Sequence, residues 1–259
     1  MVLPKKDLAL NTNNLSLDAT IIPWDTEVFS FPVASIERIH VADPVEAIRD
    51  YAKFEIWRDA HLCELVSCRL PHDRLRESML LEHFGFRFIE MVLHPVLEGL
   101  GKISISEQGL SVVSAEESDL DDILDIAESA FTNERFHADP RLDTSCSHQR
   151  YGRWVRSTLG HPRQQLLKIV DGDVLVAFFV VEVESNGSAY WHLTAVSPQH
   201  QGKGYGRRTW LAMIKYHSEA GHSSVRTTIS TRNIRVLNLY SRLNFQFLPP
   251  EMTFHWVQN

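Results

Sequence analysis

The most informative part of the chain is VSPQHQGKGYGRR, residues 196–208. An apolar strand is expected to end at Val196, and a helix is expected directly after the glycine-rich loop. Gly204 and Gly206 have no side chain that would keep a ligand away from the backbone. Backbone N–H groups at the start of a helix favour an anion, because the helix dipole is positive there. This segment therefore predicts a site for a phosphate group.

Positive charge is concentrated around this loop. The 259-residue chain has a net charge of −7, yet residues 201–250 hold eight basic side chains and one acid, Glu219. An acidic protein is a poor non-specific ligand for nucleic acid, so no nucleic-acid partner is expected. A basic segment in an acidic chain instead indicates a small polyanionic ligand.

The composition is that of a globular protein, with 44% hydrophobic and 23% charged residues. The three cysteines are too few for a disulfide framework and fit the reducing cytoplasm. The longest apolar stretch, 174–183, is about half as long as a membrane helix, so no membrane partner is expected. Cys63 and Cys68 would point to opposite faces of a strand, so we expect no metal site despite the nearby His61 and His72.

Periodicity and turn residues predict a mixed α/β (α+β) fold with a largely antiparallel sheet. Helices are expected over residues 43–57, 73–84, 120–131, 149–158, 207–221 and 233–243. Strands are expected over residues 62–70, 86–93, 110–113, 165–170, 174–183, 189–196 and 224–229, with two more around 246 and over 252–257. The segment 98–108 is poor in large side chains, so we expect domains over residues 1–108 and 109–259.

A weak internal repeat links these two segments. Residues 80–88 (LLEHFGFRF) align with residues 239–247 (LYSRLNFQF), and both predict a helix, a left-handed end and a strand. Gly85 and Asn244 stand at the left-handed position, which these residue types tolerate best. The first segment has no counterpart of the glycine loop, so we interpret it as a degenerate copy of the second. Chance similarity between two helix ends is the alternative.

Two motifs resemble those of the GNAT acetyltransferase superfamily. Residues 201–206 (QGKGYG) resemble its pyrophosphate loop, Gln/Arg-x-x-Gly-x-Gly/Ala. The segment from Asn233 to Tyr240, followed by Asn244-Phe245, looks like its N-x-x-x-x-x-x-Y-x-x-x-G-F element, with Asn in place of Gly. The resemblance covers residues 109–259. It implies a complete GNAT-like acyltransferase fold there, preceded by a truncated GNAT-like domain.

The resemblance implies acetyl-CoA as the cosubstrate. The loop amides would hold its pyrophosphate, and the backbone of the preceding strand would bind its pantetheine arm. Tyr240 would protonate the departing thiolate, whereas an ordinary half-buried helix aromatic is the alternative. The cofactor-binding residues implied are Ala195, Val196, Gln201, Gly202, Lys203, Gly204, Tyr205, Gly206, Arg207 and Asn233.

His192 is the candidate for the base that deprotonates the amine. It lies four residues before Val196, where members of the superfamily often carry Glu or His. A neutral imidazole at this position could accept a proton directly or through water. A histidine that only packs beside Trp191 fits the sequence equally well.

A second resemblance concerns the acceptor. Residues 24–32 (WDTEVFSFP) and 131–140 (FTNERFHADP) look like segments of acetyltransferases similar to dTDP-fucosamine acetyltransferase, which acetylate a nucleotide-linked amino sugar. This implies that Arg135, Phe136 and His137 wall the acceptor pocket. The alternative is that Arg135 and Asp139 only hold the loop in shape.

Together, the motifs predict an acetyl-CoA-dependent N-acetyltransferase without a metal, in which a primary amine attacks the thioester directly. The favoured acceptor is a nucleotide-linked amino sugar. Another small amine, a peptide N-terminus or a lysine is the alternative among enzymes. A non-catalytic acyl-CoA-binding module is the alternative outside them, and a homodimer stays open.

Overall fold

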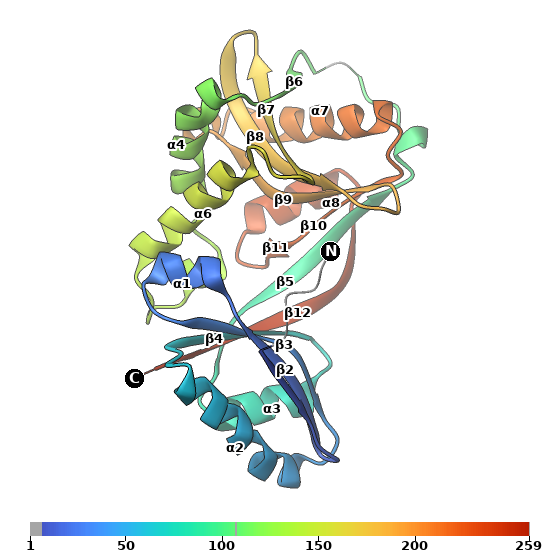
Figure 1. The fold of residues 1–259 in the computed structure, drawn as a ribbon. Helices are drawn as coiled ribbons and strands as arrows, with labels where there is room; N and C mark the ends of the chain where they lie inside the picture. Colours follow the sequence, from blue (N-terminus) through green and yellow to red (C-terminus); the bar gives the residue numbers. More distant parts are fainter. Residues whose placement is uncertain (1–6, 107, 259) are drawn as a thin grey trace. The chain divides into compact units, whose positions relative to one another are not determined.

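The computed structural model describes residues 7–106 and 108–258, and the chain divides into two compact units (Figure 1). The first unit consists of Met1–Val92, Ala138–Cys146 and Pro249–Asn259, and the second of Leu93–His137 and Ser147–Leu248. The second unit thus begins at Leu93, and two short segments of the C-terminal half belong to the first unit.

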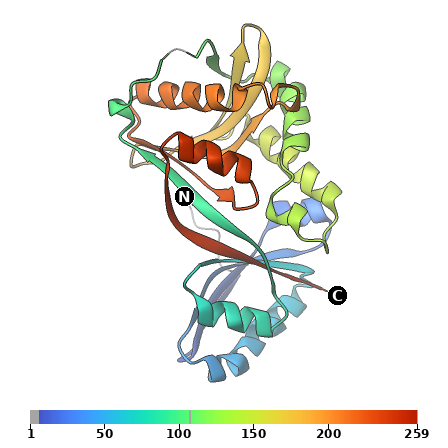
Figure 2. The same ribbon diagram turned by 180° about the vertical axis from the view of Figure 1, so that it is seen from behind.

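The first unit is built on a sheet in the order β1-β2-β3-β4-β12. β3 and β4 are parallel, whereas β1 with β2, β2 with β3 and β4 with β12 are antiparallel. Apolar residues of α2 and α3 pack on this sheet and form its core, and Figure 2 shows both helices beside the strands. The elements are β1 (Leu8–Asn11), β2 (Leu15–Ile21), α1 (Pro23–Phe29), β3 (Val33–Val41), α2 (Pro44–Ala60), β4 (Leu65–Pro71), α3 (Leu75–His83) and β12 (Gln246–Val257).

The second unit has a sheet in the order β5-β10-β9-β8-β7-β6, in which only β9 and β10 are a parallel pair. The expected mixed, largely antiparallel sheet is thus confirmed. Its strands are β5 (Arg87–Glu98), β6 (Ser111–Ser114), β7 (Gln164–Asp171), β8 (Val174–Val183), β9 (Ser188–Val196) and β10 (Ser224–Thr227), and the short β11 (Ile229–Ser230) pairs with β5.

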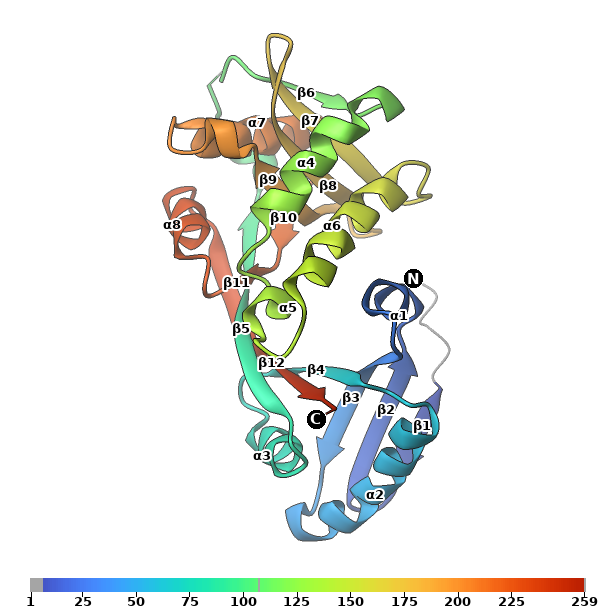
Figure 3. The same cartoon turned by 90° about the vertical axis from the view of Figure 1, so that its left-hand side faces the viewer.

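Helices cover both faces of this second sheet (Figure 3). α4 (Leu120–Ala130) and α6 (Thr144–Thr158) pack on one face around Phe178 and Val180. α7 (Tyr205–Glu219) and α8 (Ile234–Arg242) pack on the other face around Trp191. α5 (Arg135–Ala138) is a single turn between α4 and α6. Among the described residues, no helix combines the length and apolarity needed to cross a membrane.

The repeat seen in the sequence is a repeated helix end. Gly85 and Asn244 have φ angles of 84° and 60°. The amide of Phe86 donates to the carbonyl of Leu81 at 3.0 Å, and the amide of Phe245 donates to Tyr240 at 3.0 Å. Each helix therefore ends in the same left-handed motif, which satisfies its last carbonyls.

The strands that follow these two helix ends are exchanged between the units. β5 begins in the first unit and ends in the second, where residues 96–98 pair with β10. β12 begins in the second unit and ends in the first, where residues 251–257 pair with β4. β12 is also one continuous strand rather than the two short ones expected, although it contains Pro249 and Pro250.

A buried histidine stabilises the core beneath β9. His217 of α7 is 1% exposed, and its Nε2 accepts a hydrogen bond from the Trp191 indole at 3.0 Å. Its Nδ1 lies 3.0 Å from Nδ1 of His222. Burial, and then the neighbouring His222, lowers the pKa of His217 to about 3. The folded protein therefore holds this ring neutral.

This arrangement makes stability depend on pH. Below about pH 6.5 the unfolded chain protonates His217 while the folded protein does not, so the free energy of unfolding falls as pH decreases toward about 3. Between pH 7 and 5, this one group should remove about 2 kcal/mol. Urea denaturation of the wild type and His217→Gln at both pH values measures the effect. Equal losses in both proteins would contradict the assignment.

Candidate active site

The glycine loop leads into α7 with an open backbone. Gly202 and Gly204 have φ angles of 78° and 84°, a region that other residues rarely adopt. A Cβ at either position would meet no atom within 4 Å, so the space above the loop is free. Gly204 is the N-cap of α7 and has no side chain to cap it. Backbone N–H groups from Gly202 to Arg207 donate to no acceptor among the described residues.

The side chains around the loop divide into structural and exposed groups. Arg208 donates two hydrogen bonds to the carbonyl of Gln108, at 2.8 and 3.1 Å, and pairs with Asp171 at 3.3 Å. Arg208 therefore holds the fold together. Lys203 and Arg207 are exposed and form no ion pair with a described residue. Their charges remain available at an anion site made of free amides.

The loop is also tied to its surroundings by two of its own side chains. Gln201 Nε2 donates to the carbonyl of Val196 at 3.2 Å, and its Oε1 accepts from Arg235 at 3.2 Å. The hydroxyl of Tyr205 donates to Asp171 at 2.8 Å. Gln201 and Tyr205 therefore shape the loop through their side chains.

Beside the loop, the parallel pair β9 and β10 separates. Their ladder runs from Ser188 opposite Ser224 to Trp191 opposite Thr227, where β10 ends. The Thr227 hydroxyl donates to the Trp191 carbonyl at 2.8 Å at this last rung. From residue 192 to 196, β9 therefore pairs with β8 alone. Ala195 and Val196 thus lie on an edge where an extended ligand can find backbone partners.

Tyr240 of α8 lies at the point where the strands part. Its side chain is 2% exposed and interacts with Thr194 of β9, Thr227 of β10 and Trp210 of α7. Burial raises the pKa of Tyr240 to about 12, although these three neighbours act to lower it. The phenol is therefore protonated throughout the physiological range, and its hydrogen is available for a hydrogen bond or for proton donation.

Asn233 begins the helix that carries Tyr240. Its side-chain oxygen accepts a hydrogen bond from the amide of Val236 at 3.3 Å and so caps α8. Its amide nitrogen donates to no described residue. The oxygen of Asn233 is thus committed to the fold, while its NH2 group remains available to a ligand.

A β-bulge turns His192 and Thr194 to different sides of β9. Val181 pairs with Trp191 and Val180 with Leu193, so His192 is the extra residue. Trp191 consequently packs on the α7 face, while Leu193 packs on the α4 face. In a regular strand, residues 192 and 194 would share a face.

The His192 ring lies on the α6 side of the sheet. Its centroid is 5.8 Å from that of Trp154 and 4.8 Å from that of Tyr190. Its Nε2 is 3.2 Å from Oε2 of Glu182. Burial lowers the pKa of His192, whereas Glu182 acts to raise it. The ring is therefore neutral near pH 7, as a base requires. Glu182 was not among the residues predicted from the sequence, although an acid near the end of an otherwise apolar strand is an unusual feature.

The residues expected to wall the acceptor pocket are largely packed against α6. Phe136 is 1% exposed, and the guanidinium groups of Arg135 and Arg150 lie 4.4 and 4.8 Å from its ring centroid. The His137 ring stacks on that of Tyr151. Burial, and then His148, lowers the pKa of His137 to about 4. Phe136 is thus part of the interior, whereas Arg135 and His137 keep some exposed surface.

The segment after α5 is anchored in the first unit by a buried hydrogen bond. Asp139 Oδ2 lies 3.0 Å from Nδ1 of His255 on β12 and accepts from Arg141 at 2.8 Å. Burial acts to raise the pKa of Asp139, but hydrogen bonds from His255 and Arg141 lower it further than burial raises it. Asp139 therefore holds the end of this loop in place.

The described residues contain no cluster of three or more His, Cys, Asp or Glu side chains suited to a metal ion. The second unit provides backbone amides at the loop, a buried phenol at the strand separation and a neutral imidazole on the α6 side of β9. They are suited to holding a phosphate-bearing ligand and to moving protons.

Comparisons with known proteins assign a family to part of the chain. The sequence pattern of the acetyltransferase (GNAT) family matches residues 120–245. The chain is 24% identical over 228 residues to the spore coat polysaccharide biosynthesis protein SpsD of Bacillus subtilis (strain 168), covering 86% of this chain and 76% of that protein.

Solved structures share the fold over nearly the whole chain. A GCN5-related N-acetyltransferase from Sphaerobacter thermophilus matches with a TM-score of 0.63 and 13% identity, covering 96% of this chain and 82% of that one. A tandem GNAT protein from the clavulanic acid biosynthesis pathway matches with a TM-score of 0.60 and 12% identity, covering 96% and 81%. The chain therefore carries, over residues 120–245, an acyltransferase domain of the GNAT family.

Proposed function

We propose that the second unit transfers an acetyl group from acetyl-CoA to the primary amine of a nucleotide-linked amino sugar. The observation that carries this proposal is the row of free amides from Gly202 to Arg207, which adjoins the parted strands and the buried Tyr240. Free amides at a helix start suit a diphosphate, and the parted strands suit an extended arm that ends in a thioester.

The chain offers a contact for each part of the cosubstrate. The loop amides hold the pyrophosphate, with Lys203 and Arg207 adding positive charge. The backbone of Ala195 and Val196 pairs with the pantetheine arm, and the free NH2 group of Asn233 donates to it. These contacts fix the thioester beside Tyr240.

In the reaction, a neutral amine attacks the thioester carbon and CoA leaves as a thiolate. The pKa of Tyr240, about 12, lies above that of a thiol, about 8.5. Complete proton transfer from the Tyr240 phenol to the thiolate is therefore unfavourable. It is more unfavourable than it would be for a tyrosine with the ordinary pKa of about 10. Tyr240 stabilises the thiolate mainly by donating a hydrogen bond, and His192 takes the proton of the amine.

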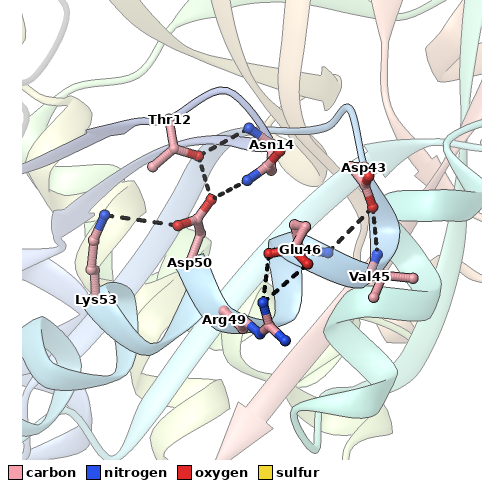
Figure 4. A network of polar contacts seen from close by, with 8 residues as sticks. All are labelled: Thr12, Asn14, Asp43, Val45, Glu46, Arg49, Asp50 and Lys53. Carbon is pink, nitrogen blue, oxygen red and sulfur yellow. Dashed lines mark hydrogen bonds and ion pairs between the residues drawn. The ribbon is translucent and has the colours of Figure 1, made fainter.

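The first unit is proposed to be a degenerate copy that does not bind acetyl-CoA. α2 joins the parallel strands β3 and β4, as α7 joins β9 and β10. Asp43 caps α2 by accepting from the amides of Val45, at 2.9 Å, and Glu46, at 3.2 Å (Figure 4). Its carboxylate thus takes the place that an anionic ligand would occupy, whereas Gly204 leaves that place open.

Several features support the acceptor class and the compartment. The relative SpsD is named a spore coat polysaccharide biosynthesis protein, which is compatible with a sugar acceptor. Arg135 lies on the segment that joins α4 to α6 and brings a guanidinium suited to a diphosphate. All three cysteines are free, which is compatible with the proposed cytoplasmic location.

Replacing Gly204 tests the anion site. Asp and Asn have the same shape and both tolerate a positive φ, so Gly204→Asp and Gly204→Asn strain the loop alike. The added carboxylate should repel the diphosphate, so Gly204→Asp should bind acetyl-CoA at least about tenfold more weakly than Gly204→Asn. Isothermal titration calorimetry measures both affinities. Equal affinities in the two variants would refute the placement of the diphosphate.

Removing the Tyr240 hydroxyl tests the chemistry. Tyr240→Phe should lower kcat by about 10- to 100-fold while leaving the KM for acetyl-CoA within about twofold, because the hydrogen bond acts mainly on the departing thiolate. Thiol release is measured with a panel of amines that includes nucleotide amino sugars, small polyamines and lysine peptides. Tyr51→Phe is the matched control, since it deletes an equally buried hydroxyl in the first unit.

The same assay separates the alternatives. An unchanged kcat in Tyr240→Phe would exclude Tyr240 as the donor. Turnover on peptides or other amines, but not on nucleotide amino sugars, would overturn the acceptor class. Tight acetyl-CoA binding without turnover on any amine would favour a binding module.

A further inference from the structure

His192 and Glu182 form a hydrogen-bonded pair across β9 and β8. Nε2 of His192 lies 3.2 Å from Oε2 of Glu182, and the other carboxylate oxygen accepts from Arg163 at 2.8 Å. The His192 and Glu182 side chains are only 21% and 13% exposed. An ionised carboxylate accepts hydrogen bonds but cannot donate them, so Nε2 must carry the hydrogen. The neutral ring is therefore the Nε2–H tautomer, with a lone pair on Nδ1.

The other ring nitrogen is left without a partner in the protein. Nδ1 of His192 forms no hydrogen bond with a described residue and is not among the fully buried atoms that lack one. It therefore keeps contact with solvent. The bulge at His192 and the flanking rings of Trp154 and Tyr190 hold the imidazole in this orientation.

We propose that Glu182 is a positioning residue for acyl transfer, which fixes His192 in the tautomer whose Nδ1 takes the proton of the acceptor amine. This inference rests on the proposed function, since it concerns the base of that reaction. In the step itself, the amine nitrogen forms a bond to the thioester carbon and the C–S bond breaks. The proton lost by nitrogen moves to Nδ1, and CoA leaves as a thiolate.

Glu182 stays ionised during this step and stabilises the imidazolium that forms. Arg163 holds the carboxylate in a fixed orientation through its ion pair with Oε1 at 2.8 Å. Removal of the negative charge should therefore weaken the base without disturbing the acetyl-CoA site, because Glu182 contacts neither the glycine loop nor α8.

The groups that face His192 determine how its pKa should change when the charge of Glu182 is removed. They are Glu182 on β8, His161 and Arg163 in the segment before β7, and Tyr190 on β9, while α6 presents the uncharged Trp154. Burial, His161 and Arg163 lower the pKa of His192, and Glu182 alone raises it. Loss of the Glu182 charge should thus lower this pKa further.

The test compares wild type, Glu182→Gln and Glu184→Gln in the full chain. Glu184 is the matched control, because it pairs with Arg226 at 3.4 Å and not with His192. NMR of 15N-labelled histidine gives the tautomer and the pKa, and His192→Gln identifies the resonance. We expect the Nε2–H tautomer in wild type and a pKa about one unit lower in Glu182→Gln only.

The pH dependence of kcat/KM for the amine provides the second readout. In Glu182→Gln, the acidic limb of this profile should move to lower pH by as much as the pKa of His192 decreases. The kcat should fall about tenfold, while the KM for acetyl-CoA stays unchanged. An Nδ1–H tautomer, an unaltered pKa or an unaltered pH profile in Glu182→Gln would each overturn the proposal. If wild type acetylates no amine, the proposed function fails. The tautomer measurement then still tests whether Glu182 fixes the Nε2–H form of His192.

Discussion

The ladder between β9 and β10 stops at the Trp191–Thr227 rung, and the arrangement of the site depends on this stop. Beyond it, β9 has an edge whose backbone is free on one side. Tyr240 packs where the two strands part, and the glycine loop follows directly at the end of β9. One break in a parallel pair therefore brings together an unpaired strand edge, a buried phenol and a row of amides.

The two units share the same local architecture, but the start of its helix differs between them. Both contain a parallel pair joined by a helix, and both end the next helix with the same left-handed motif. At the start of α2, Asp43 satisfies the amides with its own carboxylate, which favours stability. At the start of α7, Gly204 leaves them unsatisfied, which costs stability and leaves these amides available to the proposed ligand.

Local signals in the sequence predicted the local features. The glycine loop, the helix ends at Gly85 and Asn244, and the place of Tyr240 on α8 each depend on a few consecutive residues, and the structure has them. The bulge at His192 could not be predicted, because an extra residue in a strand depends on the register of its neighbour. The exchange of β5 and β12 likewise depends on pairing between distant segments, which composition does not encode.

The central claim is that the amides from Gly202 to Arg207 bind the diphosphate of acetyl-CoA at the start of α7. A crystal structure of the protein with acetyl-CoA measures this directly. The account predicts diphosphate oxygens within about 3.2 Å of these amides and the thioester beside Tyr240. A complex in which the loop amides contact only solvent, with the coenzyme bound at another place on the chain, would contradict it.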